Sequence, residues 1–181
     1  MNEYIKQCRA KFAEQLKDPK IRADVAAMMV SEDESHPLPV VESLMNRCDY
    51  AGKTLEQMLH SGFYGPINRG KLPHFLSVLK LNPEVKARMN AAIDQALAGS
   101  NTIQGFTDQG LPTDPNGRWP GGLHIHGEIF NDWGGGPGGH AGAKAWRLKF
   151  NAFAEATDEP GDDPVYPRLS PAGYPVASKS T

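Results

Sequence analysis

The sequence is poor in cysteine, which excludes several classes of small, cross-linked protein. Of 181 residues only Cys8 and Cys48 are cysteines, and they form no CxxC pair. A disulfide framework or a zinc ribbon needs more cysteines at closer spacing. We therefore expect two free, buried thiols. A Cys8–Cys48 disulfide is the alternative, with no further feature of the sequence to support it.

The chain also lacks a surplus of charge and a long apolar run. It carries 19 basic and 21 acidic residues, a net charge of −2, with both signs mixed along the sequence. Nucleic-acid-binding domains concentrate basic residues on one face, so we expect no nucleic-acid partner. No apolar run approaches the about 20 residues of a membrane-spanning helix. The first residues, MNEYIKQCRAKF, lack the apolar centre of a secretory signal. We therefore expect synthesis in the cytoplasm and no association with a membrane.

Helical periodicity dominates the first hundred residues. Apolar residues recur every three or four positions, start signals such as Asp18–Pro19 and Asn82–Pro83 precede them, and glycines follow them. The pattern predicts helices over 3–16, 18–32, 39–52, 54–62 and 82–99, with a turn-rich segment over 62–73.

The second part of the chain is rich in glycine. Residues 99–140 show little periodicity, and such a long loop is usually either functional or disordered. Its tryptophans and histidines argue against disorder. Within them, GGLHIHGEIF (121–130) alternates as one strand would. A last helix is predicted over 139–156, and Pro, Asp and Ser dominate 157–181. The sequence thus predicts a mainly α domain over 1–156, with a small β element and a Gly-rich loop region, and an extended tail over 157–181.

One acidic residue stands out by its position. Ile21, Val25 and Met28 form an apolar stripe along one face of a predicted helix, at intervals of four and three residues. Glu32 follows four residues after Met28 and continues this stripe. Partial burial, the like charges of the next two acids and the negative end of the helix dipole would all raise its pKa. A carboxylic acid that stays protonated near neutral pH suits cleavage of a glycosidic bond, because the leaving oxygen must receive a proton. The alternative is an ordinary helix-end acid that faces solvent.

The order of short motifs resembles the cell wall hydrolase family related to spore-cortex-lytic enzymes, within the lysozyme-like superfamily. The matching segments are Ser31-Glu32 at the family's acid, Asn46-Arg47 at its Asn-Arg pair, Gly62–Tyr64 at its aromatic segment and Ala91–Gly99 at its Ala-rich helix. The resemblance covers about residues 20–120. The interval from Glu32 to Asn46 is shorter than in the family, which keeps Glu34 open as the acid. The region 121–142 has no clear counterpart there.

This resemblance implies a lysozyme-like helical domain that cleaves the β-1,4 bond between N-acetylmuramic acid and N-acetylglucosamine. The enzyme would be a muramidase or a lytic transglycosylase, with Glu32 as general acid and no cofactor. Asp108 is the candidate second acid of a hydrolase, although it also suits a turn before Gly110. A transglycosylase needs none, because a substrate hydroxyl closes a 1,6-anhydro ring. We expect a monomer that reaches peptidoglycan glycan strands after release or injection, as an endolysin, a virion lysin or an effector does.

Polar and aromatic loop residues are candidates for sugar binding. They are Tyr64 and Asn68 in the turn-rich segment, Gln104, Thr107 and Gln109 in the following loop, and His126 as part of a polar groove wall. Trp119 and Trp133 could stack on sugar rings, but large aromatics more often fix a glycine-rich loop to a core. The turn-rich segment suits a purely structural turn equally well.

Two rival interpretations remain open. His124, His126 and Glu128 would share one strand face, with His140 nearby, and this set could bind zinc in a metal-dependent hydrolase. No HExxH or paired-cysteine motif supports that interpretation. The other rival is a non-catalytic module that binds peptidoglycan or forms part of a virion.

Overall fold

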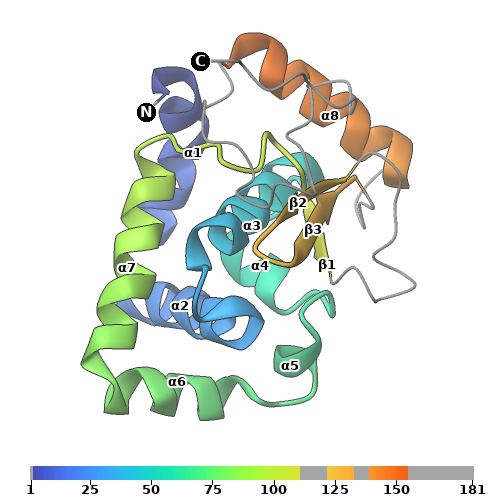
Figure 1. Cartoon of the computed structure of the whole chain (residues 1–181). Coiled ribbons are helices and arrows are strands. Elements are labelled where there is room, and N and C mark those ends of the chain that lie inside the picture. Colours follow the sequence, from blue (N-terminus) through green and yellow to red (C-terminus); the bar gives the residue numbers. More distant parts are fainter. Residues whose placement is uncertain (1, 111–121, 133–138, 155–181) are drawn as a thin grey trace, which may run out of the picture.

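A computed structural model describes residues 2–110, 122–132 and 139–154 (Figure 1). These residues form eight helices: α1 (Glu3–Gln15), α2 (Pro19–Asp33), α3 (Pro37–Ala51), α4 (Leu55–Leu59), α5 (Gly65–Asn68), α6 (Leu72–Leu81), α7 (Pro83–Leu97) and α8 (Gly139–Phe153). They also form three short strands: β1 (Asp108–Gly110), β2 (Leu123–Ile125) and β3 (Glu128–Asn131). The predicted mainly α fold with a small β element is confirmed. The predicted tail, Trp119, Trp133 and the side chain of His140 lie outside the described residues.

Local signals explain where the helices begin and end. The Asp18 side chain accepts a hydrogen bond from the Lys20 backbone N–H at 2.9 Å and caps α2, with Pro19 in its first turn. Thr54 and Gln57 form a reciprocal capping box at α4. The six predicted helices are confirmed, with ends that differ by a few residues.

Helix α6 was not predicted, and it packs against α2. Its apolar residues Leu72, Phe75, Leu76 and Leu79 repeat at helical spacing and contact the core. Three of them lie over 74–81, for which the sequence pattern gave no predicted element.

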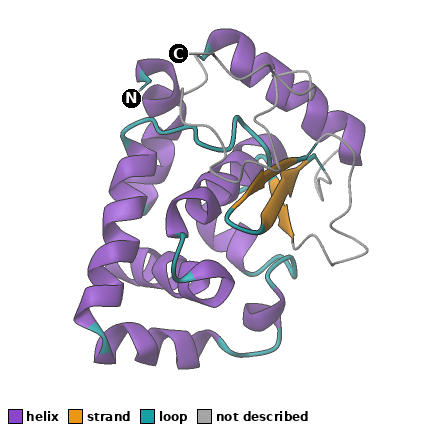
Figure 2. Ribbon diagram, in the orientation of Figure 1, coloured by secondary structure: helices purple, strands orange, loops and turns teal. Residues whose placement is uncertain are grey.

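The core of the molecule is formed by α2 and α3 with their neighbours. The stripe predicted for α3 (Val40, Val41, Leu44, Met45 and Cys48) is buried, and α4, α6 and α7 pack around α2. Figure 2 shows the sheet to one side of the helices, next to α3. A separate apolar cluster of Ile103, Phe106, Leu123, Ile125 and Phe130 supports it. None of the described helices is both long and apolar enough to cross a membrane.

The single strand predicted over 121–130 is wrong, because this segment is a hairpin. Strands β2 and β3 pair antiparallel, and the order in the sheet is β1-β3-β2. The two residues between the strands, His126 and Gly127, have φ values of +50° and +76°. Positive φ at both central residues is the geometry of the tightest hairpin turns. The turn therefore removes His126 from the strand positions of His124 and Glu128.

Candidate active site

A polar face of α3 holds the loop that leads into the sheet. Glu42 is fully buried on this helix. Its carboxylate accepts hydrogen bonds from the Ser100 hydroxyl at 2.6 Å, the Thr102 hydroxyl at 2.9 Å and the Ile103 N–H at 3.2 Å. Arg9 from α1 donates to the Ser100 carbonyl and supplies a nearby positive charge. The start of the loop is thus fixed to the helical core.

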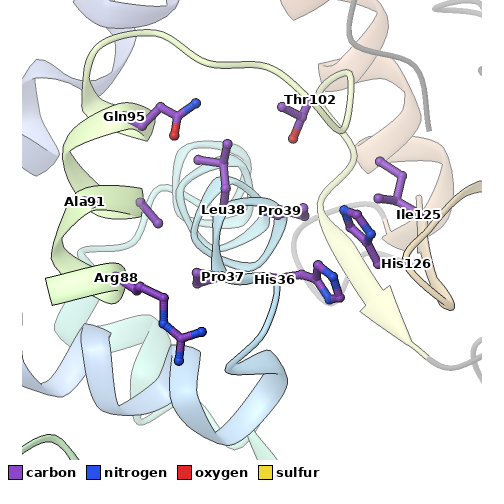
Figure 3. A pocket seen from close by; sticks show the side chains of 11 residues that line it. His36, Pro37, Leu38, Pro39, Arg88, Ala91, Gln95, Thr102, Ile125 and His126 are labelled. Atoms are coloured by element: carbon purple, nitrogen blue, oxygen red, sulfur yellow. The ribbon is translucent and has the colours of Figure 1, made fainter. Parts of the chain in front are cut away.

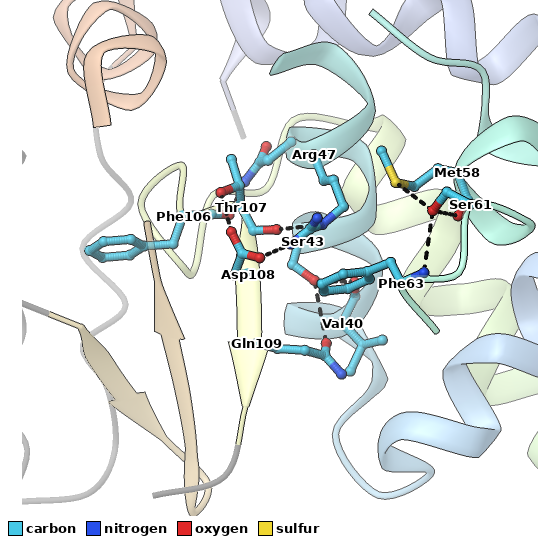
Figure 4. Close-up of polar contacts among 11 residues, drawn as sticks. Val40, Ser43, Arg47, Met58, Ser61, Phe63, Phe106, Thr107, Asp108 and Gln109 are labelled. Carbon is cyan, nitrogen blue, oxygen red and sulfur yellow. Dashed lines mark hydrogen bonds and ion pairs between the residues drawn. The ribbon is translucent and has the colours of Figure 1, made fainter. Parts of the chain in front are cut away.

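One turn further along α3, Asn46 and Arg47 hold the end of the same loop. Asn46 donates to the Phe106 carbonyl at 3.0 Å, and Arg47 Nε donates to the Thr107 carbonyl at 3.2 Å. Arg47 also forms a buried ion pair with Asp108, and its guanidinium lies 3.3 Å from the centroid of the Phe63 ring (Figure 4). The Asn-Arg pair that the sequence analysis singled out therefore positions strand β1.

Strand β1 brings Gln109 against Glu32. Gln109 Nε2 donates a hydrogen bond to Glu32 Oε2 at 2.9 Å. The Ser43 hydroxyl lies 3.4 Å from Gln109 Oε1, so both ends of the amide have a polar neighbour (Figure 4). Two residues predicted separately for the site are thus in direct contact.

Glu32 is half-buried in the last turn of α2. Burial raises the pKa of its carboxyl, while the Gln109 hydrogen bond and the positive charge of Arg69 act in the opposite direction. The net effect is a pKa above the usual value of a glutamate. The predicted direction agrees with this, and burial, one of the three predicted causes, is the largest; the two acids that follow in sequence are not among the causes.

Those two acids have other contacts. Asp33 Oδ1 accepts hydrogen bonds from the backbone N–H groups of Ser35 and His36, both at 3.1 Å. Glu34 lies 3.5 Å from Arg88 of α7, and its side chain is 46% exposed. Glu34 is thus the more solvated of the two candidate acids, and the geometry favours Glu32.

Glu128 is a second buried carboxyl beside Glu32, at the start of β3. It is only 7% exposed. Burial, a hydrogen bond with Asp33 and the charges of Asp33 and Glu32 raise its pKa to about 9. A glutamate with that pKa is neutral at pH 7, so it stays protonated beside Asp33. The sequence groups Glu128 with two histidines as a possible metal site, and no local signal in it links Glu128 to Asp33.

Two histidines extend this row of residues. The rings of His36 and His126 stack with centroids 3.8 Å apart and planes at 10°. His36 Nδ1 lies 3.3 Å from Asp33 Oδ2. From β1 outward, the row runs from Gln109 and Glu32, through the Asp33 and Glu128 carboxyls, to the stacked imidazoles.

The structure gives several other predicted site residues a structural position. Asp108 is 2% exposed, neutralised by Arg47 and bonded by the Thr107 hydroxyl at 2.7 Å, so it is not placed to act as a second acid. Thr107 is buried with it, and Gln104 is buried in a turn with φ +53°. Neither side chain is accessible to a sugar. A buried loop of this kind has no sequence signal, because its burial depends on α3, some 60 residues earlier.

Tyr64 and Asn68 lie near α5 in different environments. Tyr64 is 2% exposed and packs edge-on against Phe63, so its ring face is not available for stacking on a sugar. Asn68 is exposed. Arg69, at the end of α5, contributes positive charge at Glu32.

The proposed zinc ligands are not assembled. Among the residues that the structure describes, no three His, Cys, Asp or Glu side chains form a group that could hold a metal ion. His126 contacts His36, and Glu128 contacts Asp33. Cys8 and Cys48 are both free, with Cys48 buried and Cys8 partly buried.

No protein-family model, curated protein or solved structure matches this chain. The function must therefore be inferred from the site.

Proposed function

We propose that this protein is a lysozyme-like glycosidase that cleaves the N-acetylmuramic acid–N-acetylglucosamine bond of peptidoglycan, with Glu32 as general acid. One observation carries the proposal. Glu32 ends an apolar helix stripe, is half-buried with a raised pKa, and receives an amide hydrogen bond from a strand on the other side of the site. The order of motifs along the sequence supports the choice of peptidoglycan as the substrate.

The surroundings of Glu32 suit a general acid both before and after it donates its proton. Burial favours the protonated form of the carboxyl, and the Gln109 N–H occupies Oε2, which leaves Oε1 to carry the proton. As the glycosidic C–O bond breaks, this proton passes to the leaving oxygen, which becomes a hydroxyl. The glutamate anion that results is then stabilised by the Gln109 N–H and by Arg69.

The neighbouring carboxyls favour the lytic transglycosylase over the hydrolase. A hydrolase needs an ionised second carboxylate to activate water or to attack the sugar. Among the described residues near Glu32, Glu128 is neutral at pH 7, and Asp33 is engaged by two backbone N–H groups and by Glu128. The 6-hydroxyl group of the substrate requires neither of them: its oxygen bonds to the sugar C1 in place of the leaving oxygen, which closes a 1,6-anhydro ring, and its proton passes to the Glu32 carboxylate.

A matched pair of variants tests the proposal. Glu32→Gln removes the proton and keeps the shape, and we expect cleavage of purified peptidoglycan to fall by about 10² to 10⁴-fold. Glu34→Gln changes the neighbouring, exposed acid and should keep most of the activity. Full activity of Glu32→Gln with an unchanged fold would exclude Glu32 as the acid.

A further inference from the structure

A cavity of about 590 Å³ opens beyond the stacked histidines (Figure 3). It lies between α7, the first turn of α3 and the tip of the hairpin. Sites for small ligands measure about 300–1,000 Å³, so the cavity has the size of a binding site. Neither the acid nor its amide partner lines it.

The wall of this cavity combines small apolar groups with donors at the edge. The apolar part comes from Leu38 and its flanking prolines, from Ala91 and Ala92, and from Ile125. Arg88 and Gln95 of α7 provide the polar part.

Arg88 brings a positive charge to the edge of the cavity. Helix α3 also begins there, but the Asp33 carboxylate accepts the backbone N–H of its N-cap residue His36, so the helix end adds little free positive charge. Arg88 is 53% exposed, and its pairing with Glu34 at 3.5 Å is loose. Such an exposed ion pair is weak, so another carboxylate can compete with Glu34 for the guanidinium.

The cavity borders the outer end of the row of residues that starts at Glu32. His36 and His126 line it, and His36 contacts Asp33, the residue after Glu32. A sugar bound at Glu32 would thus have the cavity to one side. Muramic acid carries its peptide on a lactyl group next to the bond that is cleaved, and the first residues of this peptide are an alanine and an acidic residue.

We propose that this cavity binds the stem peptide of muramic acid, and this inference rests on the proposed function. The alanine methyl group packs against the small apolar wall formed by Leu38, Ala91 and Ala92. The carboxylate of the acidic residue pairs with Arg88. The protein therefore recognises glycan strands that still carry their peptides.

The test is a comparison of two ligands by isothermal titration calorimetry. N-acetylmuramyl-alanyl-glutamate carries the peptide, N-acetylmuramic acid does not, and neither contains the bond that would be cleaved. We expect the wild type to bind the peptide-bearing ligand about tenfold more tightly, which corresponds to about 1.4 kcal/mol. Ala91→Phe, which fills the cavity from α7, should abolish this preference, and Arg88→Gln should reduce it.

Ala87→Phe is the matched control, because Ala87 is exposed one turn earlier on α7 and does not line the cavity. It should keep the preference of the wild type. Equal affinity of the wild type for both ligands, or a preference that survives Ala91→Phe, would overturn the proposal. So would an Ala91→Phe variant that loses affinity for both ligands alike, since the cavity would then hold the sugar itself.

A second measurement separates this inference from the proposed function. Glycan strands stripped of their stem peptides still contain the glycosidic bond, and the wild type should cleave them, but more slowly than intact strands. Cleavage of both at equal rates would overturn the peptide site alone. Failure to cleave either one would overturn the proposed function, and with it this inference.

Discussion

The buried carboxyl of Glu128 should make the stability of the fold depend on pH. Its pKa rises from the usual 4.5 to about 9 in the folded protein, because it is buried next to Asp33 and Glu32. The folded state therefore holds this proton more tightly than the unfolded chain does. The sign follows directly: its contribution to stability is fully present below about pH 4.5 and is lost as the pH rises towards 9.

The size of the effect follows from the same two pKa values. One pKa unit is worth about 1.4 kcal/mol, so a shift of this size removes about 4 kcal/mol between about pH 5 and pH 8.5. Water near the hairpin tip screens part of this, and we expect a loss of about 2 to 4 kcal/mol. Urea unfolding followed by circular dichroism at both pH values measures it. Over the same pH range Glu128→Gln, which is neutral at every pH, should lose about 2 to 4 kcal/mol less stability than the wild type.

Glu32 and Glu42 also have raised pKa values, but they are present in both proteins. The difference between the two stability profiles therefore reports on Glu128. Glu84→Gln, at an exposed position of α7, controls for the loss of one charge and should follow the wild type. Parallel stability profiles of the wild type and Glu128→Gln would refute a protonated Glu128.

Two further outcomes test how the site is held together. Arg47→Met should cost about 3–5 kcal/mol of stability in urea unfolding, because it leaves Asp108 buried without its partner. Lys11→Met, which breaks an exposed ion pair, should cost under about 1 kcal/mol. Equal costs of the two substitutions would contradict the structural role of Arg47. Gln109→Ala removes a hydrogen bond that lowers the pKa of Glu32, so the alkaline limb of the activity profile should move to higher pH. A shift to lower pH, measured as cleavage rate against pH, would contradict this assignment.

The helices were predictable because each one carries its own local signals. The stripe that ends at Glu32 needed only helical spacing, and the cap at Asp18 needed only the residue before a proline. Helix α6 carries the same kind of signal in Leu72, Phe75, Leu76 and Leu79, so it was missed although its periodicity is present.

The hairpin and the polar partners were harder to predict for physical reasons. A two-residue turn leaves the alternation of apolar and polar residues unbroken, so His126-Gly127 looked like part of one strand. The contact between Glu128 and Asp33 joins positions far apart in the sequence. The burial of Asn46 and Arg47 depends on a loop some 60 residues later. Such contacts follow only from the tertiary structure.

Mass spectrometry of the products released from purified peptidoglycan is the sharpest test of Glu32 as the general acid. The account predicts that the wild type releases fragments that end in 1,6-anhydro-N-acetylmuramic acid, and that Glu32→Gln releases almost none while Glu34→Gln releases them normally. Glycan strands left uncut by the wild type, or the same fragments in full yield from Glu32→Gln, would contradict it.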